Sequence, residues 1–195
     1  MHELDWPLCV PVLSDGVVTL RAHTEADLAA MLEMSQDRLM TFWTSVPDPA
    51  TLADTRQFAF EVVPAGWRDG SNRVWAIEAV DPATGQGRYC GNVDLRGERL
   101  AEIGFALHPW ARGRGWAARA VRLAIDWGFT RGGVVEVSWK SLVGNIASWR
   151  VAQACGFTFY GTVPGGMRHR GSAADAWLAV ARRPAHETGH NDDTR

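Results

Sequence analysis

The most informative part of this 195-residue sequence is Glu102-Ile103-Gly104-Phe105-Ala106-Leu107-His108-Pro109-Trp110-Ala111-Arg112-Gly113-Arg114-Gly115-Trp116-Ala117. A strand pattern runs to Leu107, a short loop follows, and a helical pattern begins at the glycines. Gly113 and Gly115 permit positive φ angles and leave backbone N–H groups without side chains over them. At the positive end of a helix dipole, such N–H groups suit a pyrophosphate, and Arg112 and Arg114 add cationic donors. We therefore predict an anion-binding turn between a strand and a helix.

The sequence on either side of this turn alternates between strand and helix patterns. Three strand patterns, over 73–80, 88–95 and 100–107, are joined by turn sequences typical of antiparallel hairpins. Before them we expect a strand over 17–22, a helix over 25–34 and a second helix from Thr51 or Asp54 to about residue 63. After them we expect a helix over 115–129, a strand over 134–140, a helix over 145–154 and two closing strands over 157–162 and 174–181.

This order of elements predicts an α/β (α+β) fold, with a single mixed, mostly antiparallel central sheet of about seven strands and helices on both faces. We assign residues 1–184 to one domain and expect the polar, aperiodic residues 185–195 to form a disordered tail. The strands over 100–107 and 134–140 flank the only helical crossover in the middle of the chain. A ligand is expected at this seam.

Composition excludes several classes of protein. A formal net charge of −2 argues against a sequence-independent nucleic-acid binder, which needs a broad basic field. No apolar run approaches the roughly 20 residues that span a bilayer, and the amino terminus lacks the basic start and apolar core of a signal peptide. We therefore expect a cytoplasmic protein without nucleic-acid or membrane partners. The three cysteines have no metal-ligand spacing, so no metal is expected.

The glycine turn alone does not identify the cofactor. Residues 113–118, Gly-Arg-Gly-Trp-Ala-Ala, also satisfy the loose dinucleotide fingerprint G-x-G-x-x-A, and Glu136 lies 21 positions after Gly115. Against a nicotinamide cofactor, five residues separate Leu107 from Gly113, whereas the dinucleotide turn follows its strand directly. In addition, Glu136 falls inside a strand pattern, and antiparallel hairpins precede the turn. A nucleoside-triphosphate loop is excluded because no Gly-Lys-Ser/Thr is present.

A family resemblance combines these features. Residues 112–117, Arg-Gly-Arg-Gly-Trp-Ala, resemble the Q/R-x-x-G-x-G/A signature of the GNAT superfamily of acyl-CoA-dependent N-acyltransferases, and residues 101–109 resemble its cofactor-binding strand. Downstream, Asn145-Ile146-Ala147-Ser148 followed by Gly156-Phe157 resembles the second motif of that superfamily. The combination is most similar to the branch that acetylates the terminal amines of ribosomal proteins. The region from Thr24 to Arg73, which shapes the acceptor site in such folds, carries no recognisable motif.

The resemblance implies acetyl-CoA as co-substrate and assigns residues to it. Backbone groups of Phe105, Ala106 and Leu107 would pair with the pantetheine arm, as an extra strand does. The turn around Arg112 would hold the pyrophosphate through the N–H groups of Gly113, Arg114, Gly115, Trp116 and Ala117. Asn145 would hydrogen-bond the pantetheine, and it is also suited to cap the helix that follows it.

Two carboxylates are candidates for the general base. Glu102 is preferred, because on an alternating strand it shares a face with Gly104 and Ala106, whose small side chains leave room for a substrate. The resemblance also places a catalytic glutamate there in part of the superfamily. The alternative role for Glu102 is a salt bridge with Arg99 or another neighbouring cation, and Asp94 is the second candidate base.

Ser148 is the candidate for protonating the leaving thiolate or contacting the cofactor, with an ordinary helix serine as the alternative. Tyr160 is a further candidate acid, although it is expected on the next strand. The predicted reaction is acetyl transfer to a primary amine, either a protein N-terminus or a small molecule. A nicotinamide-dependent oxidoreductase and a non-catalytic acyl-CoA-binding module are the alternatives. A homodimer is the default expectation for the assembly.

Overall fold

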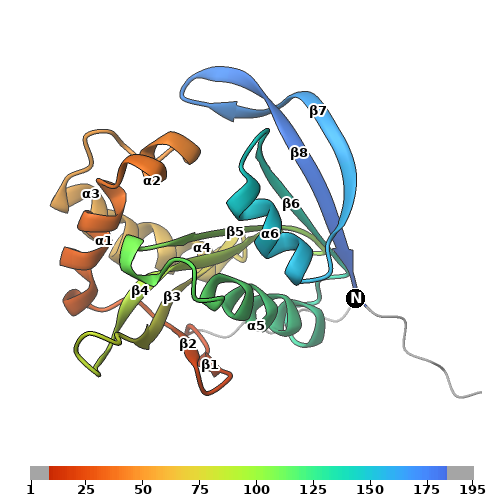
Figure 1. Ribbon diagram of the computed structural model, residues 1–195. Helices are drawn as coiled ribbons and strands as arrows, with labels where there is room; N and C mark the ends of the chain where they lie inside the picture. Colours follow the sequence, from red (N-terminus) through yellow and green to blue (C-terminus); the bar gives the residue numbers. More distant parts are fainter. Residues whose placement is uncertain (1–8, 184–195) are drawn as a thin grey trace, which may run out of the picture.

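One eight-stranded sheet organises the chain in the computed structural model, which describes residues 9–183 (Figure 1). The order across the sheet is β1-β2-β3-β4-β5-β6-β8-β7. The strands are β1 (Leu13–Ser14), β2 (Val18–Arg21), β3 (Asn72–Val80), β4 (Gly87–Arg96), β5 (Leu100–Leu107), β6 (Glu136–Leu142), β7 (Thr158–His169) and β8 (Ser172–Arg182). Within residues 9–183, β5 and β6 form the only parallel pair, and all the other pairs are antiparallel.

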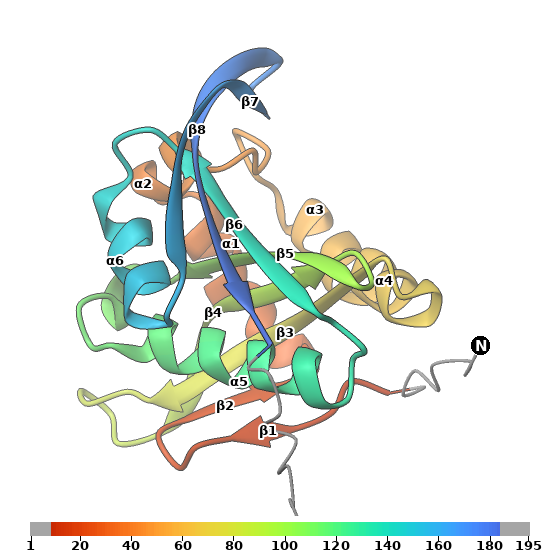
Figure 2. The same ribbon diagram turned by 90° about the vertical axis from the view of Figure 1, so that its right-hand side faces the viewer.

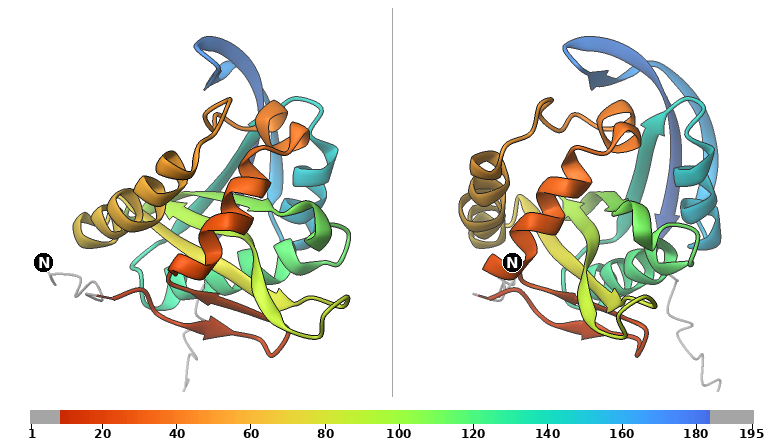
Figure 3. Two further views of the ribbon diagram at one scale, coloured as in Figure 1. Left: turned by 90° about the vertical axis from the view of Figure 1, so that its left-hand side faces the viewer. Right: turned by 60° about the vertical axis from the view of Figure 1, so that its left-hand side comes forward.

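Helices lie on both sides of the sheet (Figures 2 and 3). One side carries α5 (Trp116–Thr130) and α6 (Ile146–Ala154), and a short 3-10 helix, η3 (Pro109–Ala111), leads into α5. The other side carries η1 (Glu25–Asp27), α1 (Leu28–Ser35), α2 (Arg38–Trp43), α3 (Leu52–Gln57), η2 (Phe58–Val62) and α4 (Val63–Asp69). The predicted α/β fold with a mostly antiparallel sheet is confirmed.

The core forms where the apolar faces of the central strands meet α5. Ala120, Val121 and Ala124 of α5 are fully buried, at the three- and four-residue spacing that gives a helix one apolar face. The tryptophans contribute to this core as well, because the rings of Trp67, Trp75 and Trp127 contact one another edge to face at centroid distances of 4.8–5.6 Å. These three tryptophans therefore belong to the hydrophobic core.

The parallel pair β5–β6 separates part-way along its length. Leu100–Ile103 of β5 pair with Glu136–Trp139 of β6, and beyond this point neither strand pairs with the other. β5 continues to Leu107 against β4 alone, while β6 continues to Leu142 against β8 alone. The sheet therefore opens at the seam where a ligand was expected, and Ile103 and Trp139 mark the branch point.

The structure differs from the predicted elements in four places. β1 adds an eighth strand, and β7 and β8 extend into a longer hairpin than expected. α2 was not predicted, because six residues are too few to show a helical period in the sequence. The second helix continues past residue 63 to Asp69. It tolerates Pro64 because the π-helical turn η2 ends just before it, so that Pro64 lies at the start of α4, where the backbone needs no N–H donor. The tail expected at 185–195 lies outside the described residues.

Candidate active site

The glycine turn presents backbone N–H groups that the protein does not use. Gly113 and Gly115 both have φ +76, and a Cβ on either would meet open space, so conformation requires glycine here. Gly115 is the N-cap of α5, and no side chain caps this helix. Within residues 9–183, the N–H groups of residues 113–118 donate to no protein acceptor. The first turn of α5 thus keeps the uncompensated donors that an anion needs.

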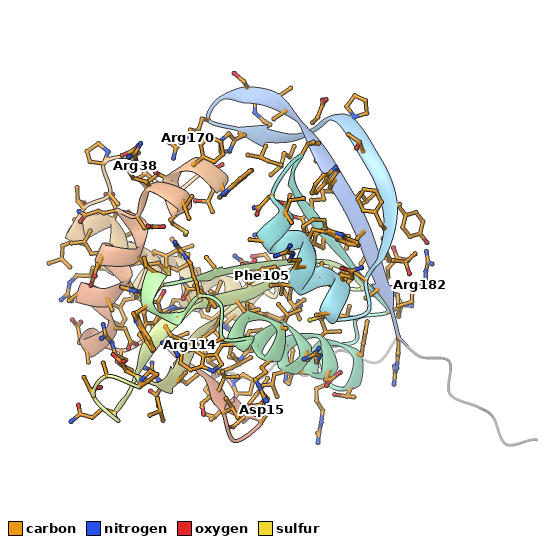
Figure 4. The ribbon with its side chains drawn as sticks, viewed as in Figure 1. Asp15, Arg38, Phe105, Arg114, Arg170 and Arg182 are labelled. Carbon is orange, nitrogen blue, oxygen red and sulfur yellow. The ribbon has the colours of Figure 1, made fainter. Side chains whose placement is uncertain are left out.

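A groove of about 670 Å³ runs from this turn along α5 (Figure 4 shows Arg114 at the start of α5). Three arginines and two aspartates line it, Arg114, Arg119, Arg122, Asp15 and Asp126, and Arg119 forms an ion pair with Asp15 at 2.7 Å. Arg114 is folded back, because its Nε donates to the carbonyl of Trp110 at 3.2 Å and its guanidinium lies over the ring of Trp116. The groove provides positive charge next to the free N–H groups.

Arg112 is directed away from the groove. Its Nε donates to the carbonyl of Leu107 at 3.1 Å, and its Nη2 donates to Asp37 Oδ1 at 2.5 Å. Although partial burial raises the pKa of Asp37, the bonds from Arg112 and from the Met40 N–H outweigh it, so this pKa lies below its ordinary value. The expected cationic donor to the pyrophosphate instead links the end of β5 to the start of α2.

The strand expected to pair with pantetheine has one free edge. Phe105, Ala106 and Leu107 are half-buried and pair with β4 on one side, and no described strand pairs with them on the other. An extended chain inserted there has main-chain groups to bind, as an added strand does. The carbonyl of Leu107 also accepts the bond from Arg112.

Two carboxylates share one guanidinium beside the branch point. Arg96 lies 2.9 Å from Asp94 and 2.7 Å from Glu102, and Lys140 of β6 lies 3.4 Å from Glu102. Burial raises the pKa of Asp94 to about 6, because the attraction of Arg96 only partly offsets the loss of water and the charge of Glu102 opposes a second anion. The predicted salt bridge of Glu102 therefore exists, with Arg96 and Lys140 in place of Arg99.

The Asp94 carboxylate lies over the backbone of Gly104. These two residues are directly opposed in the β4–β5 register, and a Cβ on Gly104 would lie 2.4 Å from Asp94 Oδ1. Such an approach leaves no room for any side chain at residue 104. Glycine at this position therefore places a carboxylate against the first residue of β5 beyond the branch point.

A hydroxyl lies on the opposite face of the sheet at the same level. Ser148 of α6 accepts a hydrogen bond from the indole N–H of Trp139 at 3.0 Å, and Trp139 is the last residue of β6 that pairs with β5. Asn145 accepts from the N–H of Ser148 at 3.1 Å, so its predicted role as the cap of α6 is confirmed. Tyr160 lies on the outer strand β7, where its hydroxyl contacts Arg182, away from the branch point.

The match to a known family follows the same elements. The family described as Acetyltransferase (GNAT) domain matches residues 18–158, from β2 to the start of β7. This chain belongs to the GNAT family. The match includes β5, the glycine turn and α6. The predicted resemblance is therefore confirmed, and the chain is a member of an acetyltransferase family.

Solved structures with this GNAT fold include ribosomal-protein acetyltransferases, in agreement with the predicted branch. RimL, a ribosomal L7/L12 alpha-N-protein acetyltransferase in complex with coenzyme A, is 18% identical, with a TM-score of 0.76 over 88% of this chain and 98% of that one. Mycobacterium smegmatis RimJ in complex with a CoA disulfide is 19% identical, with a TM-score of 0.76 over 90% and 89%. The microcin C7 self-immunity acetyltransferase MccE, in complex with acetyl-CoA and AMP, is 18% identical, with a TM-score of 0.75 over 87% and 94%.

The GNAT architecture also excludes the alternative of a dinucleotide-binding fold. A dinucleotide fold requires a doubly wound parallel sheet, whereas one parallel pair is present here among residues 9–183. Glu136, the candidate ribose ligand, lies at the start of β6 and pairs with Arg182 at 2.8 Å. Among the same residues, no helix is long and apolar enough to cross a membrane, and no group of three His, Cys, Asp or Glu side chains is placed to hold a metal.

Three functional contacts of this GNAT domain were missed in the sequence. Asp37 and Arg112 are 75 residues apart, Arg170 and Thr41 are 129 apart, and the indole of Trp139 was not linked to Ser148. Of these, only the spacing of Asp37 ahead of a short helix carried a local signal, since Asp is a preferred N-cap. The other contacts depend on the tertiary fold alone.

Proposed function

We propose that this protein transfers an acetyl group from acetyl-CoA to a primary amine, which is a protein N-terminus or a small-molecule amine. The observation that carries the proposal is the free set of N–H groups at residues 113–118, next to a strand edge with no partner. Known members of the fold, RimL and MccE, were solved with coenzyme A and acetyl-CoA, which supports this cofactor.

The turn and the strand edge would hold the cofactor in one orientation. The N–H groups from Gly113 to Ala117 receive the pyrophosphate, with Arg114 beside them. Phe105, Ala106 and Leu107 bind the pantetheine arm along the open edge of β5, with the side-chain amide of Asn145 available from α6. The acetyl thioester supplies the electrophilic carbonyl. It lies at the branch point, between the carboxylates on one face and the Ser148 hydroxyl on the other.

Asp94 is the better candidate for the base that accepts the amine proton. Its pKa of about 6 leaves it ionised at neutral pH and close to the range in which a base is efficient. Glu102, the base preferred from the sequence, has its two oxygens directed to Arg96 and Lys140. We assign Glu102 to holding Arg96 and to tuning the pKa of Asp94.

The reaction follows from these positions. The amine nitrogen forms a bond to the thioester carbonyl carbon, and the proton that it loses passes to the carboxylate of Asp94, directly or through water. The carbon–sulfur bond then breaks, and sulfur takes its electron pair. The Ser148 hydroxyl, whose oxygen accepts from Trp139, donates a hydrogen bond to this developing thiolate, and the thiolate takes its proton from solvent, so that Ser148 remains a neutral hydroxyl.

Acetyl-CoA turnover with a panel of primary amines tests the proposal. Release of free thiol that depends on the amine, together with an acetylated product by mass spectrometry, is the expected result. A thermal shift with acetyl-CoA but no thiol release with any amine or with a peptide library of free N-termini would favour the non-catalytic acyl-CoA-binding module. If neither acetyl-CoA nor CoA raises the melting temperature at concentrations up to about 1 mM, the acetyltransferase and the acyl-CoA-binding module are both contradicted.

A further inference from the structure

α2 is a short and largely exposed helix. None of its six residues is buried, and two of its apolar side chains are largely exposed, Leu39 at 53% and Phe42 at 60%. Met40 is half-buried and packs against the core cluster to which α1 contributes. At a rise of about 1.5 Å per residue α2 is roughly 9 Å long, and isolated helices of this length are not stable in water. Its position therefore depends on the packing of Met40 and on the contacts at its two ends.

The N-terminal end of α2 is fixed to the glycine turn. Asp37 accepts from the N–H of Met40 at 3.1 Å, as an N-cap does, and the same carboxylate accepts from Arg112. Arg112 also binds the carbonyl of Leu107, the last residue of β5. One side chain thus connects the pantetheine strand, the cofactor turn and the start of α2.

The C-terminal end of α2 is fixed to the tip of the β7–β8 hairpin. Both Nε and Nη2 of Arg170 donate to the carbonyl of Thr41, the former at 3.1 Å. Arg170 has φ +45, and it is the single non-glycine residue with positive φ in the described chain. A left-handed backbone costs such a residue about 1 kcal/mol, so an arginine at this position points to a role for its side chain.

These two contacts lie on opposite sides of the open seam. Arg112 belongs to the β5 side, and Arg170 belongs to the hairpin whose strand β8 pairs with β6. α2 therefore has contacts to both sides of the seam. In Figure 1 it lies above the end of β5 that is farther from β6, and the tip of the β7–β8 hairpin extends over it (Figures 1 and 3). Figure 4 shows Arg170 between the hairpin tip and α2.

We propose that Asp37 and Arg170 are positioning residues that hold α2 across the acceptor side of the seam and make its order depend on the occupied cofactor turn. The proposal rests on the proposed function, because it takes the turn to be the cofactor site. The Arg112 side chain is directed away from the groove, to Leu107 and Asp37, so a bound cofactor would act on it through the backbone of the turn.

The coupling has a defined direction. A pyrophosphate on the N–H groups of residues 113–118 restricts the turn that carries Arg112, and a restricted Arg112 loses less freedom when it binds Asp37. Cofactor binding therefore stabilises α2, and by linkage an ordered α2 favours the cofactor. The acceptor amine then binds beside an ordered α2 only after the cofactor has bound.

Hydrogen exchange of the backbone amides tests this without an acceptor. In the full-length protein, CoA is expected to slow exchange in residues 113–118 and, through Arg112, to slow exchange in α2 by about fivefold or more. Asp37→Ser retains an N-capping side chain but is too short to reach Arg112. It should abolish the effect of CoA on α2 while CoA still protects residues 113–118.

Arg170→Asn is the second variant. Asn tolerates the left-handed conformation, so the hairpin turn is retained while the guanidinium is lost. α2 should exchange about fivefold faster with and without CoA, and the Kd for CoA should rise by less than fivefold. Arg168→Gln is the matched control, because Arg168 bonds only Gly171 within its own hairpin, and α2 should exchange as in the wild type.

The outcomes separate the two proposals. If CoA protects residues 113–118 but leaves α2 unchanged in the wild type, or if Asp37→Ser keeps the CoA-dependent protection of α2, the coupling is overturned and the proposed function stands. If CoA protects neither region, the cofactor assignment and the coupling fail together. If Asp37→Ser does not fold, Arg170→Asn decides, and unchanged exchange of α2 in that variant overturns the role of Arg170.

Discussion

The indole N–H of Trp139 donates a hydrogen bond to Ser148 Oγ at 3.0 Å, and it does so at the point where β5 and β6 part. An indole can only donate, so the serine oxygen acts as the acceptor and its own hydrogen is directed elsewhere. Within residues 9–183, no protein acceptor takes that hydrogen. The bond from this buried tryptophan leaves the Ser148 hydroxyl hydrogen available to a bound ligand, which supports the proposed role of Ser148 beside the thiolate.

Ser148→Ala should lower kcat by about 10- to 100-fold with little change in the Kd for CoA, because only the developing thiolate loses a donor. Steady-state kinetics and a CoA titration measure the two quantities. Ser138→Ala is the control, since the Ser138 hydroxyl bonds the carbonyl of Ala101 within the sheet. Equal rates for the wild type and Ser148→Ala would remove Ser148 from the mechanism.

Gly115→Ala should weaken CoA binding by about tenfold, because a left-handed φ of +76 costs alanine about 1 kcal/mol or more and the relaxed turn misaligns its N–H groups. Calorimetric titration with CoA gives the Kd. Gly85→Ala is the matched control, with φ +69 and open space around it in the β3–β4 turn. It should lose similar stability but keep its CoA affinity, and a parallel loss of affinity in both variants would contradict a local role for the turn.

The local geometry of the glycine turn and of the α6 cap was predictable because its determinants lie close together in the sequence. Gly113 and Gly115 lie within one turn of each other, and strand alternation already placed Glu102 and Gly104 on one face. Asn145 and Ser148 are three residues apart, so the cap followed from the spacing. Such features depend on backbone geometry over a few residues, which a single sequence encodes directly.

The acceptor half was not predictable in the same way. Asp94 rather than Glu102 is proposed as the base because burial raises the pKa of Asp94, and this burial beside Arg96 depends on the tertiary fold and is not visible in the local pattern. α2 was missed because a six-residue helix fixed by Arg112 and Arg170 has no apolar periodicity of its own. The contacts that fix α2, from Arg112 to Asp37 and from Arg170 to Thr41, join residues far apart in the sequence and therefore leave no local pattern.

Gly104→Ala should destabilise the protein by about 1–3 kcal/mol, because its Cβ would lie 2.4 Å from Asp94 Oδ1 in a strand where neither backbone can move freely. Urea unfolding measures the change. Gly87→Ala is the control, since its Cβ would lie 3.0 Å from the end of the Glu78 side chain, a much smaller overlap than the 2.4 Å approach at residue 104. Equal stability of Gly104→Ala and the wild type would show that the carboxylate does not lie over residue 104.

Asp94 should make both stability and rate depend on pH. Its pKa is raised from 3.8 to about 6, so between these values the folded protein keeps a proton that the unfolded chain has lost. Stability is therefore fully present below about pH 4 and declines as the pH rises through 6. Asp94→Asn removes this cost, so relative to the wild type it should gain on the order of 3 kcal/mol between pH 4 and pH 8. Urea unfolding at the two pH values measures the gain.

The same group should control the rate. The wild-type kcat/KM is expected to rise with pH along a limb with an apparent pKa near 6, and Asp94→Asn should lose this limb together with most of the activity. Glu102→Gln removes a negative charge that raises the pKa of Asp94, so its limb should move to lower pH while activity above pH 7 persists. If instead Glu102→Gln abolishes turnover and Asp94→Asn retains the limb, Glu102 is the base and Asp94 only positions Arg96.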